Sequence, residues 1–304
     1  MESNLLHKKI QNKVKRWSKG FAEKERPYMY EESYTIIEKF LKSPKEKNDF
    51  ISLGIACNTL STWYCADFLE RYLNNKGDFS YSLKQSMLWG TIDPLLYAAG
   101  KQGDIKPVWF VDVCLSACNL LILQEVNKAR KLLEYTSPEN IDFNVEKPES
   151  VCQFVNKMFS IFYKDEEISY EFPKPLNDIY SNLLNDLTDE TKKDINASVN
   201  QACEFHLSRT KMYQEFDTEV KMLLPSEIVA PLLLRKRMGM DVKDIEHPLI
   251  KDLFPVIEGL IEVDTDPVFL KVVEYIKQFP SAYNIKKEVK ECALINIGST
   301  LIVQ

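Results

Sequence analysis

Glycine is the residue type that is most conspicuously scarce in this sequence. Only 9 of the 304 residues are glycine, which is about 3% where roughly 7% is usual. Phosphate-binding loops, nucleophile elbows and tight β-hairpins need glycine, because the backbone there takes positive φ values or approaches a ligand closely. The scarcity therefore argues against nucleotide-binding, hydrolase and hairpin-rich proteins before any motif is considered.

Histidine and long apolar runs are also scarce. The chain has 3 histidines, no apolar run near the ~18 residues that a membrane-spanning helix needs, and no apolar stretch of signal-peptide type after Met1. Its 7 cysteines are an odd number in a long chain, which favours buried thiols in a reducing compartment over a disulfide framework. These observations predict a cytoplasmic protein without a membrane span.

The balance of charge argues against a general nucleic-acid binder, which usually carries a basic footprint. The chain has 39 lysines and arginines against 45 aspartates and glutamates, a net charge of −6. Residues 1–30 are basic, with a net charge of +5, whereas residues 131–190 contain 5 lysines and 13 carboxylates. Complementary charge speeds and orients protein association, so the acidic segment predicts a basic partner. Acidic loops that serve only solubility remain the alternative.

The predicted partner-binding carboxylates lie in two loops of that acidic segment. One loop covers residues 139–149 and the other covers residues 165–171. The candidate residues are Glu139, Asp142, Glu146, Glu149, Asp165, Glu166, Glu167 and Glu171.

Apolar residues recur at helical spacing in nearly every long segment, and strand-like alternation is scarce. The sequence therefore predicts an all-α protein, an irregular bundle or solenoid-like array of antiparallel helical hairpins. No fixed repeat of 34 or 40–47 residues is found, as tandem helical repeats would require. Leu6, Ile10, Val14 and Trp17 define one face of an N-terminal helix, which we expect to pack on the body; a membrane-surface helix is the alternative.

Glycine, aspartate and proline residues indicate where helices are expected to begin, break and end. Gly77 and Gly239 are expected to end helices, and Asp49 to begin one. A break is predicted near residues 123–125, and another at Asp93-Pro94 within a helix over residues 82–100. Further helices are expected over residues 149–163, 176–187, 189–216 (capped by Thr188 or Asp189), 226–238, 267–279 and 281–296, with the last residues extended.

Candidate catalytic and metal-binding groups do not form a known pattern. His206 and Cys203 share a helix face, but a metal site would need further ligands. Cys114 and Cys118 lie one turn apart in an apolar helix, where buried packing is the ordinary role. No nucleophile with a base at a recognisable spacing is present. We therefore expect no catalytic residues, no metal, no cofactor and no enzymatic activity, with binding as the function.

Three landmarks in order carry a resemblance to a known family. They are the hairpin VWFVDVCLSACNLLILQEVNKARKLLEYTSPE, the helix VCQFVNKMFSIFYKDEE, and INASVNQACEFHLSRTKMY followed by PSEIVAPLLLRKRMGMDVKDIEHPLIKDLF. The sequence resembles the Imm49 immunity-protein family of bacterial polymorphic toxin systems over about residues 50–254. The matching positions are Val199, Ala202, His206, Lys211, Tyr213, Pro231, Leu232, Arg237, Gly239, Val242, Pro248, Leu249 and Leu253.

The resemblance implies an all-α protein that protects the producing cell by binding a cognate toxin domain. It supplies no catalytic residues, and the toxin is expected to be a basic nuclease if the acidic loops imitate nucleic acid. The family pattern implies a helical core over residues 46–255, with a basic extension over residues 1–45 and a C-terminal extension over residues 256–304. The competing hypothesis is a helical scaffold that binds an endogenous protein or peptide. Whether the chain is a monomer or a homodimer is left open.

Overall fold

The computed structural model describes residues 2–24, 26–43, 47–98, 110–136, 150–168, 170–172, 174–212, 214–243 and 245–277. Within these ranges the chain forms helices joined by loops and contains no strand, so the predicted all-α class is confirmed. None of the helices described there is both long and apolar enough to cross a membrane. The expected helix over residues 281–296 and the expected extended end lie outside the described residues.

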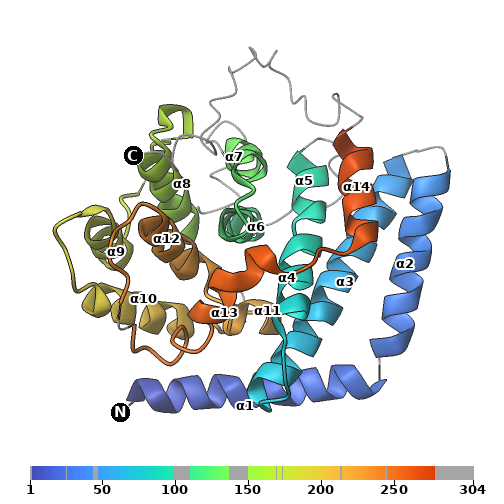
Figure 1. The fold of residues 1–304 in the computed structure, drawn as a ribbon, viewed down its shortest axis with the longest axis horizontal. Coiled ribbons are helices and arrows are strands. Elements are labelled where there is room, and N and C mark those ends of the chain that lie inside the picture. The colour runs from blue at the N-terminus through green and yellow to red at the C-terminus, as the bar shows by residue number, and fades with distance from the viewer. Residues whose placement is uncertain are drawn as a thin grey trace.

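The first five helices form one side of the molecule. In Figure 1, α1 runs along one edge, and α2, α3, α4 and α5 stand across it beside α14. The long α3 contacts α1, α2, α4 and α5, so it is the central element of this side. The bounds are α1 (Glu2–Lys24), α2 (Arg26–Lys42), α3 (Lys47–Leu73), α4 (Ser80–Trp89) and α5 (Ile92–Ala98).

The remaining helices form an irregular array of hairpins. The pairs α6–α7, α8–α9 and α9–α10 pack against each other, and α12 contacts α6, α8, α9 and α10. The bounds are α6 (Phe110–Ile122), α7 (Val126–Tyr135), α8 (Ser150–Tyr163), η3 (Glu166–Ile168), α9 (Asp178–Thr188), α10 (Asn196–Ser208), α11 (Glu219–Met222), α12 (Ser226–Arg237), α13 (Phe254–Glu258), η4 (Gly259–Glu262) and α14 (Pro267–Lys277).

Four helices end in a left-handed residue, and only one of those residues is glycine. Asn75, Gln124, Lys164 and Gly239 have φ values of 52°, 61°, 51° and 81°. In each case the next residue's N–H donates to a carbonyl five residues earlier, at 2.8–3.2 Å, as in a Schellman motif. The break predicted near residues 123–125 and the end at Gly239 are confirmed. The end expected at Gly77 occurs earlier, at Asn75.

The helix predicted over residues 189–216 is wrong in both its start and its length. The chain forms a loop from Asp189 to Ile195, and α10 begins at Asn196. Asp189 accepts a hydrogen bond from the Thr191 N–H at 2.8 Å, and Asp194 accepts one from the Asn196 N–H at 2.9 Å. These side chains offer the backbone a turn in place of a helix, so helix formation starts only after the second aspartate.

The break within residues 82–100 also lies elsewhere than predicted. It falls between Trp89 and Ile92, and Pro94 lies in the first turn of α5, where proline is tolerated. A Cβ at Gly90 would lie 2.8 Å from the Ser61 hydroxyl oxygen and 3.2 Å from the Ser86 carbonyl. Glycine is therefore needed here for the close approach of α3 and α4, and α4 ends beside it.

Two hydrophobic clusters form the interior, and α3 contributes to both. The main core gathers buried residues from α1, the C-terminal part of α3, and α4 to α13. The second core gathers buried residues from α2, the N-terminal part of α3, α4, α5 and α14. Leu123 packs against both cores.

The N-terminal helix packs on the body, as expected from its apolar face. Ile10 and Val14 are buried in the main core, and Leu6 and Trp17 pack against it. Lys13 forms an ion pair with Glu219 of α11 at 3.3 Å. The basic charge of this segment therefore lies on the outer face of a helix whose apolar face is covered.

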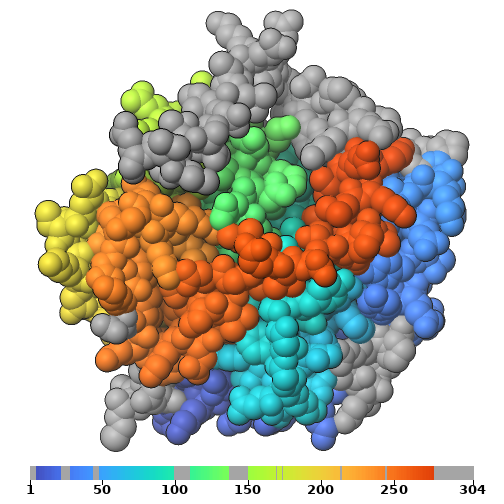
Figure 2. Space-filling view, in the orientation of Figure 1, coloured from blue at the N-terminus to red at the C-terminus, as the bar shows by residue number. Residues whose placement is uncertain are grey.

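One acidic segment crosses a face of the molecule. Figure 2 shows the chain between α12 and α14 crossing this face beside α4. We call residues 241–266 the acidic strap. It contains 8 carboxylates and 2 lysines, a net charge of −6 that equals the charge of the whole chain. The other residues of the chain therefore carry equal numbers of positive and negative groups.

Candidate protein-binding surface

Two of the predicted partner-binding carboxylates are held by one arginine. Arg130 of α7 donates to Asp165 at 2.7 Å, to Glu167 at 2.6 Å and to Glu134. Burial lowers the pKa of Arg130, but the hydrogen bonds and charges of Asp165 and Glu167 outweigh burial and leave it raised. Asp165 and Glu167 therefore link α7 to the turn after α8, and much of their charge is neutralised within the fold.

The other predicted carboxylates are placed differently. Glu166 and Glu171 are exposed, and in the described part of the chain no cation pairs with either of them. Glu139, Asp142, Glu146 and Glu149 lie outside the described residues. The structure therefore gathers Asp165, Glu166 and Glu167 at one turn and leaves Glu166 as the member whose charge faces solvent without a partner.

The C-terminal end of the acidic strap is the more negative surface. Glu262 and Asp264 are exposed, and neither forms an ion pair with a described residue. Lys84 of α4 is buried and donates to the carbonyls of Ile261 and Val263, which fixes η4 on α4, and its charge also interacts with those of Asp264 and Glu262 without forming an ion pair. The charge count along the sequence favours residues 131–190, so the acidic strap was not among the predicted partner-binding segments.

A network of tyrosine hydroxyls lies directly beneath this end of the strap. Tyr34 of α2 donates to the buried carboxylate of Asp266 and lies 3.1 Å from the Tyr64 hydroxyl. Asp266 also accepts from the Val268 N–H at 2.8 Å, so it caps α14. Burial, followed by the hydrogen bond to Asp266, raises the pKa of Tyr34, which therefore remains protonated and donates. The network joins α2, α3 and α14 at one point.

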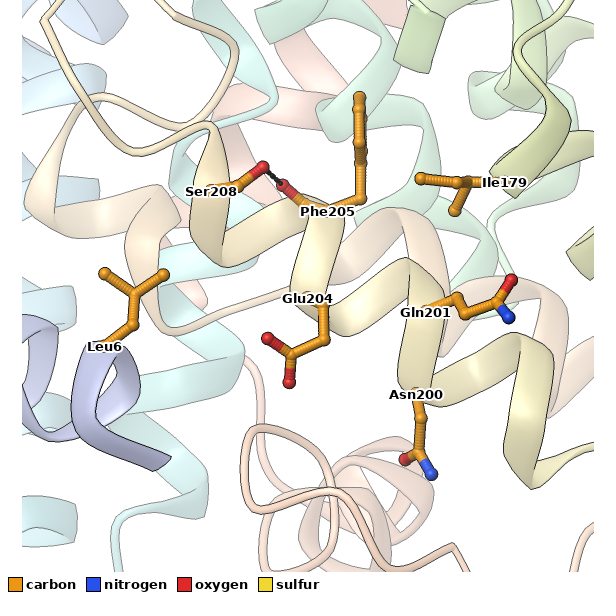
Figure 3. Close-up of a pocket in the computed structure, with 7 residues that line it drawn as sticks. All are labelled: Leu6, Ile179, Asn200, Gln201, Glu204, Phe205 and Ser208. Carbon is orange, nitrogen blue, oxygen red and sulfur yellow. Dashed lines mark hydrogen bonds between the residues drawn. The ribbon is translucent and has the colours of Figure 1, made fainter. Parts of the chain in front are cut away.

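A second candidate region is the depression between α1, α9 and α10. Its volume is about 680 Å³, and its lining includes Leu6, Ile179, Glu204 and Phe205. In Figure 3 the Glu204 carboxylate points from α10 into the space beside Leu6. The Asn200 Oδ1 atom is buried there and has no hydrogen-bond partner among the described residues. The depression is wide and shallow, which makes it a poor enclosure for a small substrate.

His247 is hydrogen-bonded to Glu204, which lines this depression, and the charge of Glu204 also acts on His7. His247 Nδ1 accepts from the Leu249 N–H at 3.2 Å, so its Nε2 carries the proton and donates to Glu204 at 3.0 Å. Burial and the nearby His247 lower the pKa of His7 on α1, and the Glu204 charge only partly offsets them. The contacts tie α1 and the strap to α10, which is a structural role.

The remaining histidine and the cysteines that drew attention in the sequence are buried. His206 is fully buried, with Nδ1 2.7 Å from Glu227 and its ring stacked on Phe216 at 3.9 Å. Cys114 and Cys118 pack in the main core as expected. In the described ranges, no group of three or more histidine, cysteine or carboxylate side chains is arranged to hold a metal ion. These residues stabilise the helix array.

Two arginines near the end of α12 bind the ends of two other helices. Arg237 donates to the carbonyls of Leu121 and Ile122 at 2.8 and 2.7 Å, so it caps α6. Arg237 lies in the last turn of α12, yet its guanidinium reaches the end of a neighbouring helix.

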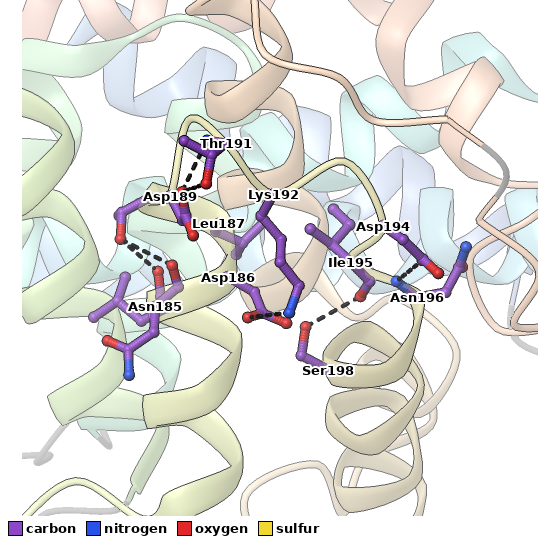
Figure 4. Close-up of polar contacts among 12 residues, drawn as sticks. Asn185, Asp186, Leu187, Asp189, Thr191, Lys192, Asp194, Ile195, Asn196 and Ser198 are labelled. Carbon is purple, nitrogen blue, oxygen red and sulfur yellow. Dashed lines mark hydrogen bonds and ion pairs between the residues drawn. The ribbon is translucent and has the colours of Figure 1, made fainter.

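Arg235 is fully buried and was not singled out by the sequence, although it has the larger structural role. Its guanidinium donates to the carbonyls of Asp186 and Leu187 at 3.0 and 2.9 Å, and also to those of Asp189, Lys192 and Asp241. Figure 4 shows the loop that it holds, with the Lys192–Asp186 ion pair and the turns at Asp189 and Asp194. Arg235 thus fixes the α9–α10 connection.

Comparison with models of protein families, with characterised proteins and with solved structures finds no match to this chain.

Proposed function

We propose that this chain is an immunity protein of the cytoplasm that neutralises a cognate toxin domain by binding it directly, without catalysis. The resemblance described above suggests the class. The observation that carries the proposal is the strap, where Glu262 and Asp264 are exposed without ion-pair partners among the described residues. Unpaired carboxylates on a rigid face favour a basic partner, because charge complementarity raises the association rate and selects against acidic proteins.

The proposed partner is a basic toxin domain, such as a nuclease whose own substrate is anionic. A nuclease surface that binds phosphates carries lysines and arginines, and the strap presents carboxylates to such a surface. The protein would then cover the toxin's substrate site. The proposal requires tight binding that weakens as salt concentration rises, because exposed charges are screened.

The test is a rescue assay with purification of the complex. The toxin domain encoded next to this chain is expressed in sensitive cells with the chain or with an empty vector, and an inactivated toxin controls for expression burden. We expect survival only with the chain and a stable complex on size exclusion. Survival without a complex would contradict direct binding and favour modification of the target. Absence of rescue would favour a helical scaffold with an endogenous partner.

Matched variants separate the two acidic surfaces. Glu262→Gln with Asp264→Asn removes two charges from the strap, and Glu166→Gln with Glu171→Gln removes two from the turn after α8 and its following loop. We expect the first pair to weaken the complex and reduce its salt dependence more than the second. Asp165 is unsuitable for this comparison, because its replacement would also break the contact with Arg130.

A further inference from the structure

An exposed cluster of aromatic rings adjoins the end of the strap. The Tyr30 ring of α2 lies 4.5 Å from Trp63 and 4.6 Å from Tyr34, measured between ring centroids. Tyr64 links this group to Tyr81 at the start of α4, at 6.1 Å. Tyr81 is 41% exposed, and Tyr30 and Trp63 are half-buried. We call Tyr30, Trp63, Tyr81 and Asp264 the aromatic–acidic surface.

The surface is held rigid from below. Gln85 of α4 donates to the Asp264 carbonyl at 2.9 Å, and it accepts from the Asp266 N–H at 3.1 Å. The carboxylate of Asp266 is in turn bound by Tyr34 and caps α14. These contacts fix the backbone that carries Asp264, and the rings are packed against each other. A pre-organised surface loses less conformational entropy when it binds.

The charge of the surface is negative. Gln85, one turn after Tyr81 on α4, binds the Asp264 carbonyl at 2.9 Å. Burial raises the pKa of Tyr81, and so do the charges of Asp266 and Asp264. Lys84 is buried and bound to the carbonyls of Ile261 and Val263, and its charge interacts with those of Asp264, Glu125 and Glu262, which outnumber it. The faces of aromatic rings are also negative and attract cations. The ring faces and the carboxylate therefore both favour a cationic ligand.

We propose that the aromatic–acidic surface binds an arginine side chain presented by a partner protein. The guanidinium is planar and weakly hydrated, so it stacks on Tyr and Trp rings while donating to a carboxylate. Asp264 is the exposed acceptor, since Asp266 is occupied by Tyr34 and by the end of α14. Tyr and Trp are also the residue types that most often dominate binding energy at protein interfaces. The proposal rests on the proposed function only for the identity of the partner.

A peptide measurement tests the surface without the toxin. The full chain is titrated into a fluorescein-labelled peptide of alternating glycine and arginine at about 150 mM salt, where distant charges are screened. The same peptide with citrulline in place of arginine keeps the shape without the charge. We expect the citrulline peptide and the variants Tyr81→Ala and Asp264→Asn each to bind roughly 3- to 30-fold more weakly. Tyr81→Phe, which keeps the ring, is expected to bind like the unchanged chain.

Two control variants match these changes elsewhere on the surface. Tyr28→Ala removes a tyrosine that is 71% exposed and outside the ring cluster, and Glu190→Gln removes an exposed charge from the α9–α10 loop. Both are expected to leave binding unchanged. Equal binding of the arginine and citrulline peptides, or equal losses in the control and test variants, would overturn the proposal. Asp264→Asn decides the matter if Tyr81→Ala does not fold.

The rescue assay then separates the two proposals. If the unchanged chain rescues and the Tyr81→Ala, Asp264→Asn double variant does not, the toxin occupies this surface. If both rescue, the toxin is excluded as its occupant while the proposed function stands. If the unchanged chain fails to rescue, only the proposed function is contradicted, and the peptide result still decides the surface.

Discussion

The two cores of this protein use polar side chains in different ways. Around the main core, arginines bind carbonyls and carboxylates of other elements, as Arg235, Arg237 and Arg130 do. Beside the second core, tyrosine hydroxyls and tilted or edge-on aromatic rings make the contacts, and the nearby carboxylates Glu262 and Asp264 have no described ion-pair partner. The comparison teaches that negative charge alone does not mark a binding surface; what matters is whether the fold already neutralises it.

The largest expected effect is on the main core. Arg235→Met would leave five backbone carbonyls without their donor, four of them at the end of α9 and in the following loop. Removing one partner of a buried charged network typically costs about 3–5 kcal/mol. We expect the free energy of unfolding, measured with urea, to fall by about that amount. The neighbouring variant Lys236→Met, at an exposed ion pair, is expected to change it by less than ~1 kcal/mol.

A smaller effect is expected from the tyrosine network. Tyr34→Phe removes the hydroxyl that donates to Asp266 and contacts Tyr64, so a buried carboxylate loses one donor. Such a loss typically costs about 1–2 kcal/mol. Tyr28→Phe, at an exposed ring, is the control. Equal midpoints of thermal unfolding for the two variants would show that the hydroxyl network contributes little, and the contrast between the cores would be weaker than described.

Arg130→Met tests whether the turn after α8 is neutralised by the fold. Its partners are partly exposed, so the expected loss of stability is only about 1 kcal/mol. Removing the cation also frees Asp165 and Glu167, and we expect the variant to bind a basic peptide more tightly at low salt. The exposed Lys174→Met variant changes the net charge equally and serves as the control. Identical binding by both variants would mean that these carboxylates are already as available as those of the strap.

The smallest expected effect is a pH dependence through His7. Burial and His247 lower the pKa of His7 below its ordinary value of 6.5, so the unfolded chain takes up the proton first as the pH falls. Its contribution to stability is therefore intact at high pH and is lost as the pH falls through 6.5. We expect a shallower decline in His7→Gln than in the unchanged chain, measured by urea unfolding at several pH values. Parallel curves would contradict this.

Local signals in the sequence were enough for most helices. The break near residues 123–125 follows from a change of apolar pattern, and the structure places Gln124 there in the left-handed conformation. The helix expected to begin at residue 189 does not form there. Asp189 and Asp194 instead form turns with the backbone two residues ahead. The spacing of apolar residues predicts a helix here, but it does not reflect these competing side-chain hydrogen bonds to the backbone.

Long-range partners could not be read from the sequence. Arg235, Lys236 and Arg237 are consecutive basic residues, yet one is buried in a loop, one is exposed beside Glu258 and one caps α6. Similarly, Trp63 and Tyr64 are adjacent large aromatic residues that the sequence alone does not distinguish. The structure buries Tyr64 and leaves Trp63 half-exposed beside Tyr30. The exposure of these two rings depends on which face of α3 packs against α2. That packing joins segments that are distant in the chain.

The two arginines of α12 that bind the ends of α6 and α9 also bear on how the chain is synthesised. The Ile122 carbonyl accepts a hydrogen bond from Arg237, which lies 115 residues later in the chain. At a synthesis rate of about 5–20 residues per second, the ribosome adds that arginine roughly 6–23 s after α6 is complete. During that interval α7, α9 and α10 are synthesised before the arginines that bind the ends of α6 and α9. A chain truncated before residue 235 would lack the donors for these carbonyls, so we expect it to be less stable than the full chain.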